Sequence, residues 1–358
     1  MERFSVPTTV CFGPDALDAL KELAGRRVLV VTDEFLARSG LLEQVLARLE
    51  GCTVDTFTGV VPDPPLEVVA RGVRRTEDFR PDALVAFGGG SAMDCAKAMA
   101  HFSTLHPPLW AIPTTAGTGS EVTSFAVLTN SRQGVKYPLV DDSLLPQLAV
   151  LDPAFLAQIP PAVTADTGMD VLTHAAEAYV ASRATPYSDA LAEKAFTLAW
   201  ENLPAAFAAQ GAAPAKADML LASNLAGLAF NTAGLGLCHG MAHALGGKYH
   251  LPHGRLNAML LPHIIRFNAA EAGTAKKYGR LARLCGLSPT WRALAFGLDR
   301  LRGQLKLPAK LSACGVEGKT VRSDAEAIAA AALADRCTPA NPRPATGEEV
   351  TAILKELV

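Results

Sequence analysis

The sequence predicts an α/β protein of two domains, a Rossmann-like parallel-sheet domain over residues 1–160 and an all-α domain over residues 161–358. Two observations support this fold class. Before about residue 160, short β-rich runs alternate with helical periods, which is typical of a doubly wound parallel sheet. After Pro160 and Pro161 the chain reads as nearly continuous helix, dense in Ala and Leu. A length of 358 residues suits two domains, and 49% hydrophobic residues are enough for two cores.

The first domain consists of strand-like runs that are each followed by a helical pattern. We expect strands at 27–32, 53–57, 83–87 and 109–112, one helix after the first strand to about Leu49, and further helices from Leu66 and from Ser91. The prolines at 62, 64 and 65 indicate a connection within the domain rather than a linker between domains.

One stretch of the second domain, from Met219 to Gly247, contains no charged residue and so looks like a membrane span. It also contains Asn, Thr, His and Gly residues, which hydrocarbon would penalise heavily. We therefore interpret it as a buried pair of helices, and we expect no membrane partner.

Charge and cysteine content exclude several other classes. A net charge of −2 gives no electrostatic reason to expect nucleic acid or an anionic membrane as a partner. The first residues lack the apolar core of a secretory signal. Seven scattered cysteines without a CxxC pair are typical of reduced thiols in the cytoplasm rather than of a disulfide framework.

A glycine-rich segment points to a nucleotide. Gly88, Gly89, Gly90 and Ser91 lie between a buried strand and a helix. Glycines let the backbone approach a pyrophosphate, and the N–H groups that start the next helix favour its negative charge. The segment is neither a GxGxxG nor a Walker motif, and alone it is as often a tight turn as a cofactor site.

Two further features favour a dinucleotide. A second loop carries hydroxyls at Thr114, Thr115 and Thr118 after another buried strand, where they suit phosphate or nicotinamide. Asp33 ends the first strand, where a carboxylate can accept hydrogen bonds from a ribose and repel a 2′-phosphate; its alternative role is to cap the next helix. Together they predict NAD(H) rather than NADP(H).

The second domain concentrates its histidines. Asp170 and His174 are four residues apart, a spacing that places a carboxylate and an imidazole on one face of a helix. His239 and His243 repeat the spacing, and His253 follows in a segment that reads as a turn. One carboxylate and three of these imidazoles, at 174, 239 and 253, make a mixed set that suits Fe²⁺ or Zn²⁺. Each of these residues alone is more often a core or capping residue than a ligand. The pair His239 and His243 lacks the glutamate that acts as general base in a metalloprotease helix, so a metalloprotease is not expected.

Taken together, a set of ordered segments resembles the iron-containing (group III) alcohol dehydrogenases over essentially the whole chain. The segments are Gly88–Asp94, Ile112–Glu121, Thr167–His174, His239–Gly247, Leu251–Asn257 and Thr338–Arg343. The resemblance implies the two-domain fold of that family, which dehydroquinate synthase shares. It also implies one divalent metal, Fe²⁺ or Zn²⁺, with Asp170, His174, His239 and His253 as its ligands.

The same resemblance gives roles to residues around the metal. It implies that His243 is a non-ligand histidine of the active site. Asp94, in the first segment, joins the cofactor candidates. Lys136 is either an anchor for the nicotinamide ribose or a surface lysine after a turn.

Within that family the chain most resembles the short propanol dehydrogenases of propanediol-utilisation microcompartments. The segments that carry this likeness are Gly134–Leu139, Thr164–His174 and Asp189–Lys194. The likeness implies a protein of the bacterial cytoplasm or of a microcompartment lumen, a homodimer or higher homo-oligomer, and contact with shell or enzyme partners.

The expected reaction is reversible hydride transfer between NAD(H) and a short aldehyde or alcohol, with propionaldehyde and 1-propanol as the leading pair. The metal acts as a Lewis acid on the substrate oxygen, and His243 exchanges the proton. Three alternatives stay open. One is a metal- and NAD-dependent lyase of the dehydroquinate synthase type, which needs more basic residues than Lys248 and Arg255 of the motif segments. The others are a metal-free reductase of the maleylacetate type and a non-catalytic scaffold with a structural metal.

Overall fold

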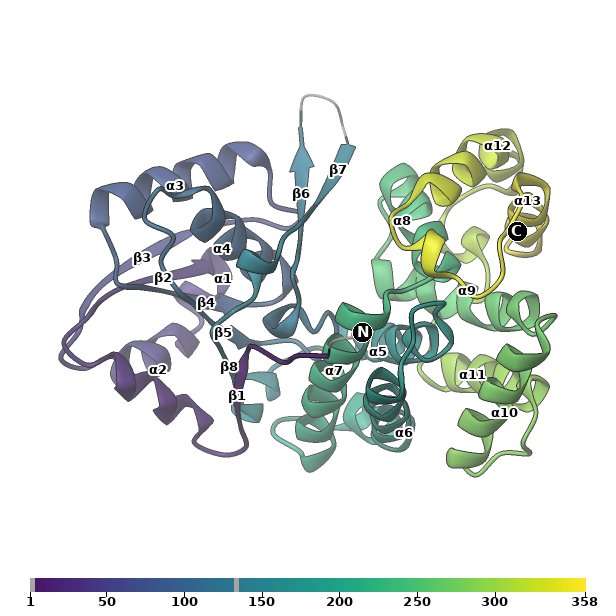
Figure 1. Cartoon of the computed structure of the whole chain (residues 1–358), viewed down its shortest axis with the longest axis horizontal. Coiled ribbons are helices and arrows are strands. Elements are labelled where there is room, and N and C mark those ends of the chain that lie inside the picture. The colour runs from purple at the N-terminus through teal and green to yellow at the C-terminus, as the bar shows by residue number, and fades with distance from the viewer. Residues whose placement is uncertain (1–3, 132–134) are drawn as a thin grey trace. The chain divides into compact units, whose positions relative to one another are not determined.

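The computed structural model describes residues 4–131 and 135–358; the side chains of residues 135 and 136 lie outside the described part. The chain forms two compact units. The first contains residues 1–159 and 210–212, and the second contains residues 160–209 and 213–358 (Figure 1).

The first unit is built on a six-stranded parallel sheet with the strand order β1-β8-β5-β4-β2-β3 (Figure 1). Its strands are β1 (Thr9–Phe12), β2 (Arg27–Asp33), β3 (Thr53–Val60), β4 (Ala83–Gly88), β5 (Leu109–Pro113) and β8 (Leu148–Leu151), and the separate strands β6 (Phe125–Asn130) and β7 (Val135–Val140) pair antiparallel. Its helices are η1 (Ala16–Leu23), α1 (Glu34–Arg38), α2 (Leu41–Arg48), α3 (Leu66–Phe79), α4 (Gly90–Phe102), η2 (Ser120–Val122), η3 (Asp142–Leu144) and η4 (Pro153–Leu156). The predicted parallel α/β sheet is confirmed.

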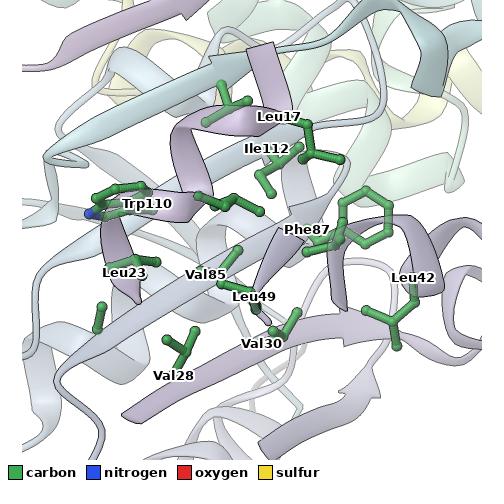
Figure 2. Packing of buried hydrophobic residues seen from close by; sticks show 14 of the residues in the cluster. Leu17, Leu23, Val28, Val30, Leu42, Leu49, Val85, Phe87, Trp110 and Ile112 are labelled. Carbon is green, nitrogen blue, oxygen red and sulfur yellow. The ribbon is translucent and has the colours of Figure 1, made fainter. Parts of the chain in front are cut away.

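Helices cover both faces of this sheet because its central strands are apolar on both sides. On β2, Val28 and Val30 point to the face covered by η1 and α2, together with Phe87 of β4 (Figure 2). Leu29 and Val31 point to the opposite face, which α3 and α4 cover. Buried strands without polar alternation are typical of parallel sheets. The carboxyl edge of such a sheet is where ligands usually bind.

Three details differ from the sequence expectation. Strands β1 and β8 of the parallel sheet were not predicted. The predicted helix up to Leu49 is two helices, α1 and α2, because Gly40 adopts φ 82° and starts a new helix there. The antiparallel pair β6–β7, which follows a loop rich in Thr and Gly, was not predicted either. The parallel character of the sheet is as predicted.

The second unit is helical throughout its described elements, as predicted. Its long helices are α5 (Pro161–Val180), α6 (Pro186–Ala208), α7 (Pro214–Ala233), α8 (Leu237–Tyr249), α9 (His253–Asn268), α10 (Ala272–Leu284), α11 (Trp291–Gln304), α12 (Gly318–Ala334) and α13 (Gly347–Glu356), with short turns η5 (Leu311–Cys314) and η6 (Thr338–Ala340). Proline starts α5, α6 and α7, where its missing N–H costs nothing.

Among the described residues, no single helix is long and apolar enough to cross a membrane. By length and composition alone, one pair of helices within the described part of the chain, α7 and α8, would suffice together, and the two helices meet at an angle of 105°.

Candidate metal centre and cofactor loops

Helix α5 supplies two of the predicted ligands. Asp170 and His174 lie one turn apart on the same face and are both buried. The His174 ring stacks between Phe230 of α7 and His239 of α8, with ring centroids 4.6 Å away on each side. Asp170 lies in the middle of the helix, so the helix dipole does not explain a buried carboxylate at this position.

The start of α8 brings His239 to this face. Glu177 of α5 accepts hydrogen bonds from the backbone N–H groups of Cys238 (2.7 Å) and His239 (3.4 Å), so its carboxylate caps the helix. A Cβ at Gly236 would lie 2.7 Å from Glu177 Oε1, which is why glycine is required there. The carboxylate also lies 2.5 Å from Nδ1 of His239.

This contact joins two buried titratable groups. Burial raises the pKa of Glu177 to about 8 and lowers the pKa of His239 well below its usual value, so burial favours the neutral form of both groups. A proton lies between Nδ1 and the carboxyl oxygen, and Nε2 on the other side of the ring lies 3.8 Å from Asp170 Oδ1. A carboxylate behind an imidazole is the usual support of a histidine metal ligand.

His253 reaches the same place from α9. It is the first residue of that helix. The sequence had suggested a turn at this position, and that expectation is wrong. Its Nε2 lies 3.5 Å from Asp170 Oδ1. Two neighbours hold the helix start against α5: a Cβ at Gly254 would lie 2.0 Å from the carbonyl oxygen of Asp166, and Arg255 binds the Asp166 carboxylate at 3.0 and 3.2 Å.

The candidate ligand atoms lie close together. One atom each from Asp170, His174 and His239 lie within 4.8 Å of one another, and His253 adds a fourth donor next to Asp170. Asn257, a buried residue of α9, donates to Asp170 at 2.7 Å, and its Nδ2 lies 3.2 Å from Nε2 of His239 and 3.1 Å from Nε2 of His253. Ligands of one Zn²⁺ or Fe²⁺ lie roughly 3–3.5 Å apart. These residues fit a divalent cation.

His243 lies beside this cluster on the next turn of α8. Its ring stacks on His253 with centroids 5.0 Å apart, and its Nδ1 lies 2.9 Å from Oδ2 of Asp335, in the segment between α12 and η6. The carboxylate orients the ring and fixes which nitrogen carries a proton.

The predicted cofactor segments follow three neighbouring strands of the first unit. Asp33 ends β2, Gly88 ends β4, and Thr114 follows β5, and these strands are adjacent in the sheet. The carboxyl edge of a doubly wound sheet is where nucleotides bind. Among the described residues of α4, no side chain caps the N-terminus and no acidic residue lies in the first turn, so its N–H groups can receive a phosphate.

Close contacts join these segments. Gly88 has φ 154°, and a Cβ there would lie 2.6 Å from Cβ of Ala92 and 3.9 Å from Asp33 Oδ2. A Cβ at Gly89 would touch the side chain of Thr115 at 3.4 Å, and one at Gly90 would approach Thr118 to 3.0 Å. Asp33 also caps α1, since its Oδ1 accepts from the N–H of Leu36.

The remaining cofactor candidates have protein partners. Ser91 accepts a hydrogen bond from the N–H of Asp63 at 3.3 Å. Asp94 turns toward the second loop, where it accepts from Ser120 (3.1 Å) and from the N–H of Val127 (3.0 Å). The side chain of Lys136 lies outside the described residues.

Sequence reasoning missed several residues around both sites. Glu177 lies three residues after His174 and Asn257 four after His253, so helical spacing from a ligand could have found both. Asp335 has no such signal, because it lies far from every ligand in sequence. Lys97 was missed as well: it is fully buried, and its Nζ donates to the carbonyl oxygens of Thr123 and Phe125 at 2.7 Å each.

Comparison with known proteins identifies the family of this chain. Residues 7–153 match the family model for iron-containing alcohol dehydrogenases, and residues 164–358 match the C-terminal model of the same family. The chain is 42% identical to a 1-propanol dehydrogenase, PduQ, of Citrobacter freundii, over 100% of both chains.

Two solved structures share the fold. A 1,3-propanediol oxidoreductase is 37% identical over 100% of both chains, with a TM-score of 0.93. Sulfoacetaldehyde reductase from Bifidobacterium kashiwanohense, solved in complex with NAD⁺, is 28% identical over 100% of this chain and 98% of the other, with a TM-score of 0.90. The chain therefore belongs to the Fe-containing alcohol dehydrogenase family of NAD-dependent oxidoreductases.

Proposed function

We propose that this enzyme reduces short aliphatic aldehydes with NADH and oxidises the corresponding primary alcohols with NAD⁺, and that propionaldehyde and 1-propanol are its physiological pair. The convergence of three buried donors, Asp170, His174 and His239, at one point carries the proposal. The full-length identity of 42% to a 1-propanol dehydrogenase supports the choice of substrate.

In this proposal Asp170, His174, His239 and His253 hold one divalent cation, Fe²⁺ or Zn²⁺. The bound cation supplies a Lewis acid that polarises the carbonyl oxygen of the aldehyde. When Glu177 is ionised it accepts from Nδ1–H of His239, which leaves the lone pair of Nε2 for the cation. Asn257 holds the Asp170 carboxylate in place through a 2.7 Å hydrogen bond. Both residues act by orienting the donors before the substrate arrives.

The proton of the reaction is assigned to His243. Reduction moves a hydride from NADH to the carbonyl carbon and requires one proton at the carbonyl oxygen. Asp335 accepts from Nδ1 of His243 at 2.9 Å, so Nε2 is the ring atom that exchanges a proton with the substrate oxygen or with solvent. The imidazole is partly exposed, which gives it a path to bulk water.

The dinucleotide is assigned to the carboxyl edge of the first sheet. The backbone of Gly88, Gly89 and Gly90 and the N-terminus of α4 receive the pyrophosphate, with Ser91 and Asp94 in the same turn. Oδ2 of Asp33, the oxygen that does not cap α1, meets the adenosine ribose and repels a 2′-phosphate. The hydroxyls of the second loop, Thr114, Thr115 and Thr118, complete the cofactor site, with Lys136 at the nicotinamide ribose.

The lyase alternative is weakened by two ion pairs. A phosphorylated sugar acid needs cationic side chains in the site, and the basic residues in or directly after the two histidine segments are Arg255 and Lys248. Arg255 binds Asp166 and Lys248 lies 3.3 Å from Asp324, so both charges are already neutralised. Homo-oligomerisation and a place in a microcompartment lumen, among shell or enzyme partners, belong to the same proposal and rest on the resemblance to propanol dehydrogenases.

Chain-length dependence tests the substrate. We expect kcat/KM for NADH-dependent reduction to be highest with propionaldehyde among acetaldehyde, propionaldehyde and butyraldehyde. If kcat/KM were highest with an aldehyde of another chain length, the proposed specificity for propionaldehyde would be wrong, whereas the proposed dehydrogenase activity would stand.

The His253→Ala substitution tests the metal site. His253 is 37% exposed, so its removal leaves no large cavity. We expect kcat to fall by at least about 10²-fold, since Lewis-acid catalysis contributes several kcal/mol, while the Kd for NADH stays within about twofold. His263→Ala on the same helix, where the ring lies 2.8 Å from Glu356 instead, is the matched control and should keep its activity. Equal activities of the two variants in metal-replete buffer would refute the ligand assignment.

A further inference from the structure

We propose that His243, Asp335 and Cys337 form a second site for a divalent metal, of the kind that takes Zn²⁺, next to the centre formed by Asp170, His174 and His239. The three residues each offer one ligand atom, and these atoms lie within 4.8 Å of one another. The set shares no residue with the first centre, so each can bind its own ion.

The local backbone holds this second cluster in place. Oδ1 of Asp335 accepts from the N–H of Cys337 at 2.8 Å, which leaves Oδ2 directed at Nδ1 of His243, 2.9 Å away. The Thr338 hydroxyl donates to the carbonyl oxygen of Ala332 at 2.6 Å and closes the turn from the other side. The carboxylate and the cysteine are thus fixed relative to each other before an ion arrives.

Gly240 lets this turn approach α8. A Cβ at Gly240 would lie 2.2 Å from Oγ1 of Thr338 and 2.8 Å from the carbonyl oxygen of Ala332. Only glycine permits this approach, and His243 lies on the same face of α8, three residues further on. The close packing of the two segments brings Asp335 and Cys337 to His243.

The two clusters differ in access and in donor chemistry. The side chain of His243 is 38% exposed, whereas that of His239 is 1% exposed, so an ion from solvent can reach the second cluster directly. The first centre offers imidazole and carboxylate donors only. A thiolate beside an imidazole and a carboxylate is a softer set that selects Zn²⁺ over Mg²⁺ or Mn²⁺. Three protein ligands leave one tetrahedral position for water.

Binding is a ligand exchange without electron transfer. The thiol of Cys337 loses its proton to solvent as the metal–sulfur bond forms. The ion replaces the hydrogen bond between His243 and Asp335, so the proton on Nδ1 passes through solvent to Nε2 and the freed lone pair of Nδ1 binds the ion. An ion that is coordinated by His243 immobilises the ring that exchanges the proton. Inhibition by Zn²⁺ therefore rests on the function proposed above, whereas the metal site itself does not.

Cobalt substitution tests the site without any activity measurement. The full-length protein is stripped of metal and titrated with Co²⁺. We expect two bound ions per chain, and a thiolate-to-cobalt charge-transfer absorption that belongs to one of them. The Cys337→Ala variant should lack this absorption and should bind only one ion. The Asp335→Asn variant should bind the second ion with an affinity that is roughly tenfold or more lower. Cys238→Ala is the control, because Cys238 is the buried cysteine beside His239.

Gly240→Ala is a second variant that keeps all three ligands. It should lower the affinity for the second ion while the first ion remains bound, because the added methyl group separates the segment 335–338 from α8. A single bound Co²⁺ in the unaltered protein, or an absorption that persists in Cys337→Ala or disappears in Cys238→Ala, would overturn the proposal.

A kinetic arm separates this site from the proposed function. With Fe²⁺ in the first centre, added Zn²⁺ should inhibit the unaltered enzyme and should inhibit Cys337→Ala at least about tenfold less strongly. Two bound ions with a thiolate absorption but no inhibition would support the site and refute the role of His243. Equal inhibition of both proteins would refute the link between this site and catalysis.

Discussion

At the scale of single residues, Asp33 illustrates how one carboxylate can serve two purposes. Its Oδ1 caps α1, and its Oδ2 lies near Gly88 at the carboxyl edge of the sheet. Sequence reasoning foresaw both roles, because a strand that ends in Asp before a helix allows both. A substitution that keeps the cap and removes the charge can therefore separate them.

Replacing Asp33 is expected to relax the preference for NADH over NADPH. Asp33→Ser retains a side-chain oxygen for the cap, and Asp33→Gly removes both functions. In each variant the ratio of kcat/KM for NADH to that for NADPH should fall by about tenfold or more, since repulsion of the 2′-phosphate is lost. Only Asp33→Gly should also lower the Tm. An unchanged ratio in Asp33→Ser would leave Asp33 as a helix cap alone.

Asp94 is expected to make stability depend on pH. Burial raises its pKa to about 6 in the folded state, above the usual 3.8. Below 3.8 the carboxyl is protonated in both states, and between 3.8 and about 6 the unfolded chain loses its proton first. The folded state thus loses stability as pH rises through this window, and the loss is complete above pH 6.

The Asp94→Asn variant provides the reference for this effect. Its Tm relative to that of the unaltered protein, measured without cofactor, should rise between pH 4 and pH 7, because the amide does not titrate. A constant difference over this range would show that Asp94 keeps an ordinary pKa.

Single-residue signals identified the candidate donors but not the residues that contact them. Asp170, His174, His239 and His253 follow from spacing and resemblance, and the structure brings them together. The contact of Glu177 with the start of α8 could not be predicted, since it depends on how two helices meet. The same holds for Asp335.

At the scale of elements, the packing of α9 against α5 decides whether the fourth donor reaches the metal centre. The sequence suggested a turn around His253, because Pro252 and Gly254 flank it. In the structure proline precedes the first helical residue, and the glycine allows contact with the carbonyl oxygen of Asp166. Both residues are explained by a helix start that packs closely, which residue composition cannot distinguish from a turn.

Gly254→Ala is expected to separate the two helices. The new methyl group would lie 2.0 Å from the Asp166 carbonyl oxygen, so α9 must shift. We expect a loss of about 1–3 kcal/mol in stability and a lower metal content after dialysis. Gly273→Ala in α10 is the matched control: no atom lies within 4 Å of its added Cβ, and alanine there should stabilise the helix slightly. Equal metal content in the two variants would show that the approach of α9 does not matter.

At the scale of the whole molecule, the chain divides into a sheet unit and a helical unit. Alternating strands and helices predicted the first, and a run rich in Ala and Leu predicted the second. The strand order could not be predicted from the sequence, because it depends on contacts between segments that are distant along the chain, and the pairing of β6 with β7 was not predicted either.

Metal and cofactor are expected to stabilise different units. In calorimetry of the full chain, removal of metal by a chelator should lower the Tm of the transition of the helical unit by about 5–10 °C. NADH should raise the Tm of the other transition. A shift of one and the same transition by both ligands would contradict the assignment of metal to the second unit and dinucleotide to the first.

The central claim is metal-dependent hydride transfer to a short aldehyde. The most direct measurement follows NADH absorbance with propionaldehyde, first with chelated protein and then after anaerobic reconstitution with Fe²⁺ or Zn²⁺. We predict that chelated protein oxidises NADH at a negligible rate and that one of the two metals restores turnover. Undiminished oxidation without metal, or none with any short aldehyde despite bound metal and NADH, would contradict the claim.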